Sequence, residues 1–170
     1  MDHYTLIEYI NIYFHQNKCL YLINFLNNYN KDIQLIVLDE TARTATDAAK
    51  SLNTKVGSIV KSLLFKDSEK NFHLCLVSGD KYASIKKISD LINLPITKAN
   101  ADECKEFTGF SIGSISPIAH DNIPSSILID TNLSKYEIVF AAAGHPYVVF
   151  GVSYLTLCDL TKGTESNITE

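Results

Sequence analysis

The stretch IVKSLLFKDSEKNFHLCLV, residues 59–77, decides the fold of this chain. Residues 59–65 and 72–77 are rich in apolar and β-branched side chains, which is typical of buried strands. The residues between them, 66–71, are all polar, as expected for an exposed turn. The stretch therefore predicts a β-hairpin near the middle of the chain.

Further strands and helices follow outward from this hairpin. Since they do not alternate strictly, the pattern favours a mixed α/β (α+β) fold, with a curled, barrel-like mixed β-sheet surrounded by helices. Strands are expected over residues 33–38, 126–129, 137–142 and 147–152, and helices over residues 45–52, 85–92, 101–107 and 154–160.

Several helix boundaries carry recognisable end signals. Thr44 and Asp47 have the spacing of a capping box, in which each residue satisfies a backbone N–H group of the other. Asn100 and Ser153 are suitable N-cap residues for the two later helices. Gly163 is expected to end the last helix.

The domain organisation follows from the same patterns. Residues 1–30 have apolar side chains at helical spacing and predict an N-terminal helical extension. Residues 31–163 contain all the predicted strands and are expected to form one domain. Residues 164–170 are largely polar and are expected to be a frayed tail.

Composition excludes several classes of protein. Of the 170 residues, 46% are hydrophobic and 20% are charged, which rules out disorder, collagen-like repeats and a coiled coil. The formal net charge of −4 argues against a protein that coats nucleic acid through bulk charge. Local binding of a nucleic-acid end remains open.

No segment predicts export or membrane insertion. The start, Met1-Asp2-His3, is acidic where a signal peptide needs positive charge, and no apolar run approaches the ~18 residues of a membrane helix. We therefore expect a cytoplasmic protein without a membrane partner. The four cysteines are far apart in the sequence, with no metal-binding spacing, so we expect them to be reduced thiols that hold no metal. They are Cys19, Cys75, Cys104 and Cys158.

Lys61 is the most informative single position. Alternation along the strand places it on the same face as Ile59, Leu63 and Phe65. An ammonium on an apolar face is costly unless a partner compensates its charge. Either Lys61 extends to water at the sheet edge, or it is an inward cation that awaits a carbonyl, carboxylate or phosphate group.

A second unusual segment is TGFSIGSISPIAH, residues 108–120. It fits neither helix nor strand, and it is too apolar for a solvent loop. Its Gly113 and neighbouring backbone N–H groups suit close approach of a ligand, as in an anion nest or oxyanion hole. A tight structural turn is the alternative. The spacing matches neither a Walker loop nor a dinucleotide-binding loop, so no cofactor is expected.

Two histidines and two serines accompany this segment. His120 closes it, and His145 stands in a glycine- and proline-marked turn further on. Neither histidine belongs to a metal-ligand pattern, so no metal is expected. Ser114 and Ser116 lack the G-x-S-x-G elbow of a serine hydrolase.

Taken together, four segments resemble the YbaK/ProX-type aminoacyl-tRNA deacylase family, the editing domain found within or beside prolyl-tRNA synthetases. The order of the four is far more specific than any one of them, and the similarity spans residues 31–162. The segments are TARTA (41–45), VGSIVKSLLF (56–65), TGF through G-x-x-x-P to histidine (108–120) and FAAAGHP (140–146).

The resemblance implies roles for particular residues. Lys61 corresponds to the family's functional hallmark, the G-x-x-x-P loop helps to hold the aminoacyl ester, and the A-A-G-H-P turn lines the same pocket. The loop here lacks a further proline and glycine that many relatives have, which leaves amino-acid preference open. Catalytic roles are expected for Lys61, Gly113 and His145, and substrate binding for Arg43, Ser114, Ser116, Pro117, His120 and Gly144.

The function implied is that of a freestanding trans-editing hydrolase. It would deacylate mischarged tRNA that carries a small amino acid of the Cys, Ala, Ser or Thr class, because a synthetase cannot reject such near-isosteric residues well. The partners implied are the 3′ aminoacyl end of tRNA and a prolyl-tRNA synthetase. Two alternatives remain: a non-catalytic module that binds aminoacyl-tRNA or a synthetase, and a hydrolase of another small ester.

Overall fold

The computed structural model describes residues 17–30, 33, 35–42 and 44–170. The first half of the predicted N-terminal helix and Arg43 therefore lie outside the described residues.

The predicted hairpin forms the centre of the fold. Strands β2 (Ile59–Asp67) and β3 (Phe72–Ser78) pair antiparallel over seven residues, from Val60 opposite Ser78 to Lys66 opposite Phe72. Asp67 shapes the turn, since its Oδ1 accepts hydrogen bonds from the backbone N–H groups of Glu69 and Asn71.

The sheet is mixed, as predicted. β2 pairs parallel with β6, and β3 pairs parallel with β5, whereas β6 and β7 are antiparallel. The sheet is curled but not closed, because β1 and β8 stand at opposite ends of the strand order. That order is β1 (Leu35–Val37), β7 (Val148–Val152), β6 (Val139–His145), β2, β3, β5 (Ser126–Asp130) and β8 (Thr164–Ser166).

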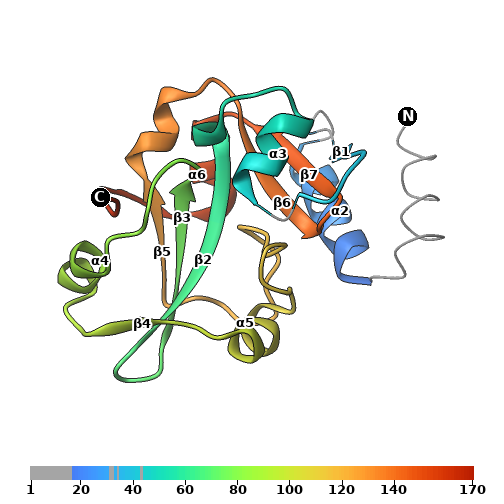
Figure 1. The fold of residues 1–170 in the computed structure, drawn as a ribbon. Helices are drawn as coiled ribbons and strands as arrows, with labels where there is room; N and C mark the ends of the chain where they lie inside the picture. Colours follow the sequence, from blue (N-terminus) through green and yellow to red (C-terminus); the bar gives the residue numbers. More distant parts are fainter. Residues whose placement is uncertain (1–16, 31–32, 34, 43) are drawn as a thin grey trace.

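The second edge of β2 is shared by two strands that diverge. β6 pairs with Ile59 and Val60, and β4 (Ile96–Lys98) pairs with Phe65–Asp67. Among the described residues, no strand pairs with residues 61–63 on this edge. Figure 1 shows β2 crossing the centre of the molecule, with β6 and β4 toward its opposite ends. This gap in the sheet positions the site described below.

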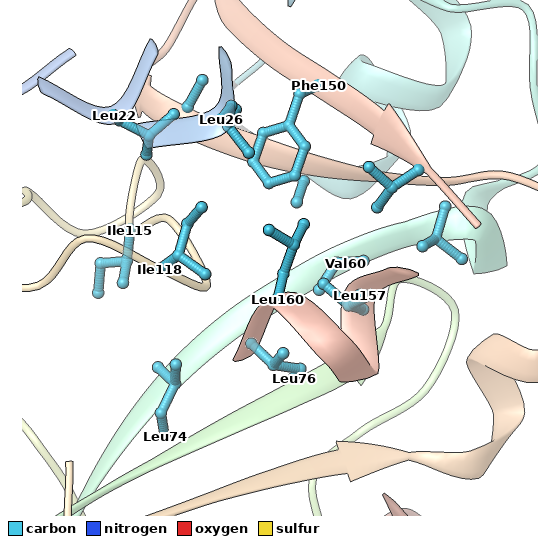
Figure 2. Close-up of a cluster of buried hydrophobic side chains, with 14 of the residues drawn as sticks. Leu22, Leu26, Val60, Leu74, Leu76, Ile115, Ile118, Phe150, Leu157 and Leu160 are labelled. Atoms are coloured by element: carbon cyan, nitrogen blue, oxygen red, sulfur yellow. The ribbon is translucent and has the colours of Figure 1, made fainter. Parts of the chain in front are cut away.

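The larger core lies between one face of the sheet and helices α2 (Asn17–Tyr29) and α6 (Tyr154–Thr161). Figure 2 shows Leu22 and Leu26 of α2 and Leu157 of α6 converging with Val60 and Phe150 of the sheet. Helix α2 therefore packs into the same core as the strands.

Smaller apolar clusters cover parts of the opposite face. Helix α4 (Ile85–Ile92) buries Ile88 against a cluster that includes Phe65, while α3 (Ala45–Ser51) buries Ala48 and Ala49 against Ile59. Helix α5 (Ala101–Thr108) contributes Cys104 to the larger core. No helix within the described ranges is long and apolar enough to span a bilayer.

The predicted N-caps are confirmed. Thr44 and Asp47 form a complete capping box at α3, Asn100 and Glu103 form another at α5, and the Ser153 side chain accepts from the backbone of α6. The end of α6 differs from the prediction, because Lys162 rather than Gly163 adopts the left-handed conformation, at φ 53°.

The expectation of a frayed tail at residues 164–170 is wrong. Strand β8 pairs parallel with β5, Thr169 forms a bridge with Ala83, and the side chain of Ile168 is fully buried. A single isoleucine in a polar segment shows no periodicity, yet its burial and the backbone pairing anchor the segment. The short strand β4 was likewise not predicted, because only Ile96 of its three residues is buried and three residues show no alternation.

Candidate active site

A cavity of about 510 Å³ lies at the gap in the edge of β2. Its lining comes from both faces of β2, from α3, from β6 and the turn after it, and from the loop that carries Ile112, Gly113 and Ile115. Lys61, Gly113 and His145, the three residues expected to be catalytic, all line it. The tertiary structure thus gathers three segments that are far apart in the sequence.

Lys61 reaches this cavity because of strand alternation. Ile59 and Phe65, on the same face, are buried in the two smaller clusters, and Lys61 lies between them at the cavity wall. Its half-buried Nζ donates a hydrogen bond to the carbonyl oxygen of Lys81. The Nζ also lies 5.5 Å from the ring centroid of Tyr82.

Opposing influences act on the Lys61 ammonium. Burial lowers the pKa of Lys61, the negative charges of Asp80 and Asp130 raise it, and the positive charge of Lys98 lowers it. Asp130 is fully buried and is held by hydrogen bonds from the backbone N–H groups of Ser78 and Asn132. The site therefore places a cation next to apolar walls, with two carboxylates to support its charge.

The 108–120 segment is a loop anchored in the larger core. Ile115 and Ile118 are buried there (Figure 2), and Ser116 is fully buried. Gly113 has a positive φ of 87°, and a Cβ built on it would meet no atom within 4 Å. Buried anchors thus fix a loop whose glycine faces open space at the cavity.

His120 braces this loop from behind. Its Nε2 lies 2.7 Å from the carbonyl oxygen of Ser116, and its ring packs edge-on against Phe110. Burial lowers the pKa of His120, although its bond to Ser116 opposes that effect. Neither His120 nor Pro117 lines the main cavity; both border a shallower hollow of about 210 Å³ beside Phe25.

Gly144 sets the position of His145 through packing. It has φ 83°, and a Cβ at this position would lie 2.7 Å from Cε1 of Phe110. The pairing of β6 with β7 shifts register between Ala142 and His145, which lets the strand accommodate this close approach. Gly144 therefore does not line the cavity itself. Its close contact with Phe110 supports the neighbouring residue His145, which does line it.

His145 is oriented by the turn that follows β6. The backbone N–H of Tyr147 donates to its Nδ1 at 3.3 Å, and the two rings stack with centroids 5.7 Å apart. Burial lowers the pKa of His145, which favours the neutral ring. When Nδ1 accepts a hydrogen bond in the neutral ring, the proton resides on Nε2. In this arrangement His145 offers a donor rather than a base.

The residues expected to bind substrate are thus distributed unevenly. Arg43 lies outside the described residues, though Ala42 and Thr44 on either side of it line the cavity. The remaining five do not line it and instead belong to the segments that support its walls: Ser114, Ser116, Pro117, His120 and Gly144.

Three lining residues were missed by sequence reasoning. Lys98 reaches the cavity through the pairing of β4 with β2, and Tyr82 through the turn after β3; neither has a distinctive local pattern. Ser62 also lines the cavity, and its buried hydroxyl has no hydrogen-bond partner among the described residues. The sequence does not show whether a serine inside a strand has a hydrogen-bond partner, because that depends on the packed structure.

All four cysteines are free, and burial raises the pKa of Cys19 to about 11 and of Cys75 to about 12. Within the described part of the chain, no cluster of three or more His, Cys, Asp or Glu side chains could hold a metal ion.

Comparison with known proteins decides the family. Residues 39–160, most of the chain, match the model of the aminoacyl-tRNA editing domain. The chain belongs to the aminoacyl-tRNA editing domain family. The resemblance drawn from the four sequence segments is thereby confirmed, and the cavity lies within the matched residues.

Two relatives match over most of this chain. A solved structure described as a candidate trans-editing enzyme for prolyl tRNA synthetase superposes with a TM-score of 0.84, at 29% identity, over 91% of this chain and 98% of that one. The uncharacterized protein YwhH of Bacillus subtilis (strain 168) is 25% identical over 118 residues, which cover 68% of this chain and 73% of YwhH.

A third relative is much longer. The proline–tRNA ligase of Thermosipho africanus (strain TCF52B) is 32% identical over 109 residues, 64% of this chain. The match spans only 19% of the ligase. The similarity is therefore to one part of that protein.

Proposed function

We infer that this editing domain hydrolyses the ester bond of mischarged aminoacyl-tRNA in trans, with a preference for a small amino acid. The family supports this inference, as does the structural relative described as a candidate trans-editing enzyme. The observation that carries it is the meeting of the Lys61 ammonium and the open Gly113 loop at one cavity.

The chemistry follows from this arrangement. Hydrolysis of an ester needs a positioned water and donors that stabilise the developing oxyanion, each donor typically being worth ~3–4 kcal/mol. Lys61 and the backbone N–H groups near Gly113 are the donors that polarise the ester carbonyl or hold the terminal nucleotide. Water then attacks the carbonyl carbon, the C–O bond to the ribose breaks, and the ribose oxygen takes up a proton.

A substrate hydroxyl is the better candidate to assist proton transfer. The two possibilities are the free ribose hydroxyl next to the ester and the ring of His145. Since Nδ1 of His145 accepts from Tyr147 and its pKa is lowered by burial, the ring presents Nε2–H as a donor. The ribose hydroxyl remains as the group that can relay a proton from the water.

The cavity wall favours a small side chain. Ala99, Cys104 and Ala142 line it together with Leu64 and Val149. One methylene in such a pocket is worth only ~1–3 kcal/mol, so a separate hydrolytic pocket supplies discrimination that a synthetase lacks. We propose substrates of the Cys, Ala, Ser or Thr class.

The partners proposed are the 3′ aminoacyl end of tRNA and a prolyl-tRNA synthetase. The net charge of −4 gives the chain little general attraction for RNA. Selection of the tRNA is therefore expected to be weak or delegated to the synthetase. Strong, steeply salt-dependent binding of bare tRNA by this chain would contradict that expectation.

A panel of tRNAs charged with Cys, Ala, Ser or Thr tests the function. Wild type is expected to release at least one amino acid, and Lys61→Ala to lose at least ~100-fold in rate while its melting curve stays cooperative. Lys86→Ala, a change at an exposed lysine paired with Asp90, is the matched control and should leave the rate unchanged.

Three other outcomes would overturn the proposal. Full activity in Lys61→Ala would remove Lys61 from the chemistry. Binding without hydrolysis would favour a non-catalytic module. Hydrolysis of simple amino-acid esters, with none of aminoacyl-tRNA, would favour a hydrolase of another small ester.

A further inference from the structure

Tyr82 stands at the mouth of the cavity with most of its ring in solvent. Its side chain lines the cavity, yet it is 79% exposed, more than any other tyrosine among the exposed hydrophobic residues of the described chain. The deeper lining residues Ala99 and Cys104 are buried. An exposed aromatic ring next to a site is typical of a surface that binds another flat or apolar group.

The loop that carries Tyr82 is held from both sides. Toward the cavity, the Lys61 ammonium donates to the carbonyl oxygen of Lys81 and lies 5.5 Å from the Tyr82 ring centroid. Toward the C-terminus, the backbone N–H of Glu170 donates to the carbonyl oxygen of Tyr82 at 3.1 Å. The backbone N–H of Ser84 donates to the carbonyl oxygen of Ile168 at 2.8 Å.

The buried C-terminal segment therefore braces the same loop that contacts Lys61. Lys87 adds a further link, since its Nζ donates to the carbonyl oxygen of Thr169 at 2.6 Å. Because the backbone that carries Tyr82 is held in this way, the loop loses little conformational freedom when a ligand stacks on the ring, so more of the stacking energy appears as affinity.

We propose that Tyr82 stacks against the adenine of the 3′-terminal adenosine of the substrate tRNA. The inference rests on the proposed function, because it takes the ester to lie at Lys61. The terminal base is joined to the ester through a single ribose, so it must lie close to Lys61, and the exposed aromatic ring there is Tyr82.

Two neighbouring residues fit the same ligand. Ile112 lines the cavity from the 112–115 loop and is 55% exposed, which provides an apolar surface beside the base. Lys98 also lines the cavity and brings a positive charge near Lys61, where a phosphate of the RNA backbone can bind. Stacking is tolerant of base identity because every base has a π-face, so Tyr82 contributes affinity rather than tRNA choice.

A fluorescent base at the RNA terminus tests this proposal directly. The probe is an acceptor-stem hairpin RNA that ends in 2-aminopurine riboside and carries alanine through a non-hydrolysable 3′-amide. Wild type and Tyr82→Phe should quench its fluorescence on binding. Tyr82→Ala should bind roughly 5- to 100-fold more weakly and leave the base unquenched. Tyr21→Ala is the matched control, since Tyr21 is an exposed tyrosine on α2 that does not line the cavity.

Kinetics provide a second readout. With alanyl-tRNA, Tyr82→Ala should raise KM by a similar factor, whereas Tyr82→Phe, which keeps the ring, should retain the wild-type KM. Equal quenching and equal KM in wild type and Tyr82→Ala would overturn the stacking proposal alone. Tyr82-dependent quenching without any hydrolysis by wild type would support stacking and overturn the proposed function instead.

Discussion

Nε2 of His73 lies 3.0 Å from Oδ2 of Asp67, and both side chains are buried beside the β2–β3 turn. Burial alone would raise the pKa of Asp67. Hydrogen bonds from His73, Asn71 and Glu69 outweigh that effect and lower this pKa to about 2. The ionised carboxylate therefore organises the hairpin on which the site is built.

Asp67→Asn should lower the free energy of unfolding at neutral pH, because the amide cannot accept all of these hydrogen bonds. Since folding lowers the pKa of Asp67 from 3.8 to about 2, its contribution is complete above about pH 4. It is lost as the pH falls toward 2. Urea unfolding across this range should show wild type and variant converging in acid. Asp90→Asn, on the exposed surface of α4, is the control, and a constant difference at all pH values would contradict the prediction.

The charge of Lys61 should limit binding at alkaline pH. Its pKa is lowered by burial, so the ammonium is lost below the ordinary value of 10.5 as the pH rises. Affinity for the amide-linked substrate analogue should fall through that lowered pKa, as measured by calorimetry. Asp80→Asn removes a negative charge that raises the pKa and should move the fall to lower pH. Lys98→Met should move it to higher pH, and shifts of both variants in the same direction would refute this account.

Gly113 and Gly144 should respond differently to alanine. Both have positive φ, which costs an alanine about 1–2 kcal/mol, but only Gly144 also has a neighbouring ring in the way of a Cβ. Gly144→Ala should therefore lower the free energy of unfolding by about 2–4 kcal/mol. Gly113→Ala should lower it by only about 1–2 kcal/mol. The added methyl group of Gly113→Ala would occupy open space in the cavity, where the substrate is proposed to bind. The deacylation rate of this variant should therefore fall at least ~10-fold despite its small loss of stability. Urea unfolding and the tRNA assay separate the two effects.

Ser62 and Ser78 form a matched pair of serines with buried hydroxyls. The Ser62 hydroxyl has no partner among the described residues, whereas the Ser78 hydroxyl donates to the carbonyl oxygen of Gly57 at 2.6 Å. Ser62→Ala should leave the free energy of unfolding unchanged or raise it by about 1 kcal/mol. Ser78→Ala should lower it by about 1–3 kcal/mol, because it leaves buried groups unpaired. Urea unfolding of the two variants measures this difference, and an equal loss of stability in both would contradict it.

Local patterns in the sequence determined much of this fold. The hairpin of residues 59–77, the capping box at Thr44 and the face on which Lys61 lies were all predictable. Each depends on residues within a few positions of one another, so periodicity and cap chemistry report them directly. The order of the four family segments likewise needed no coordinates.

Tertiary structure alone decided which residues share the cavity. Divergence of β4 and β6 opens the edge of β2, and the pairing of β4 with β2 brings Lys98 to the same cavity as Lys61. The pairing of β8 with β5, together with backbone hydrogen bonds of Ile168 and Glu170, makes residues 164–170 a brace for the Tyr82 loop, although their composition predicts a polar tail. These contacts join segments that are far apart in the sequence, so no local pattern reports them. They are determined by strand register and by burial in the folded chain.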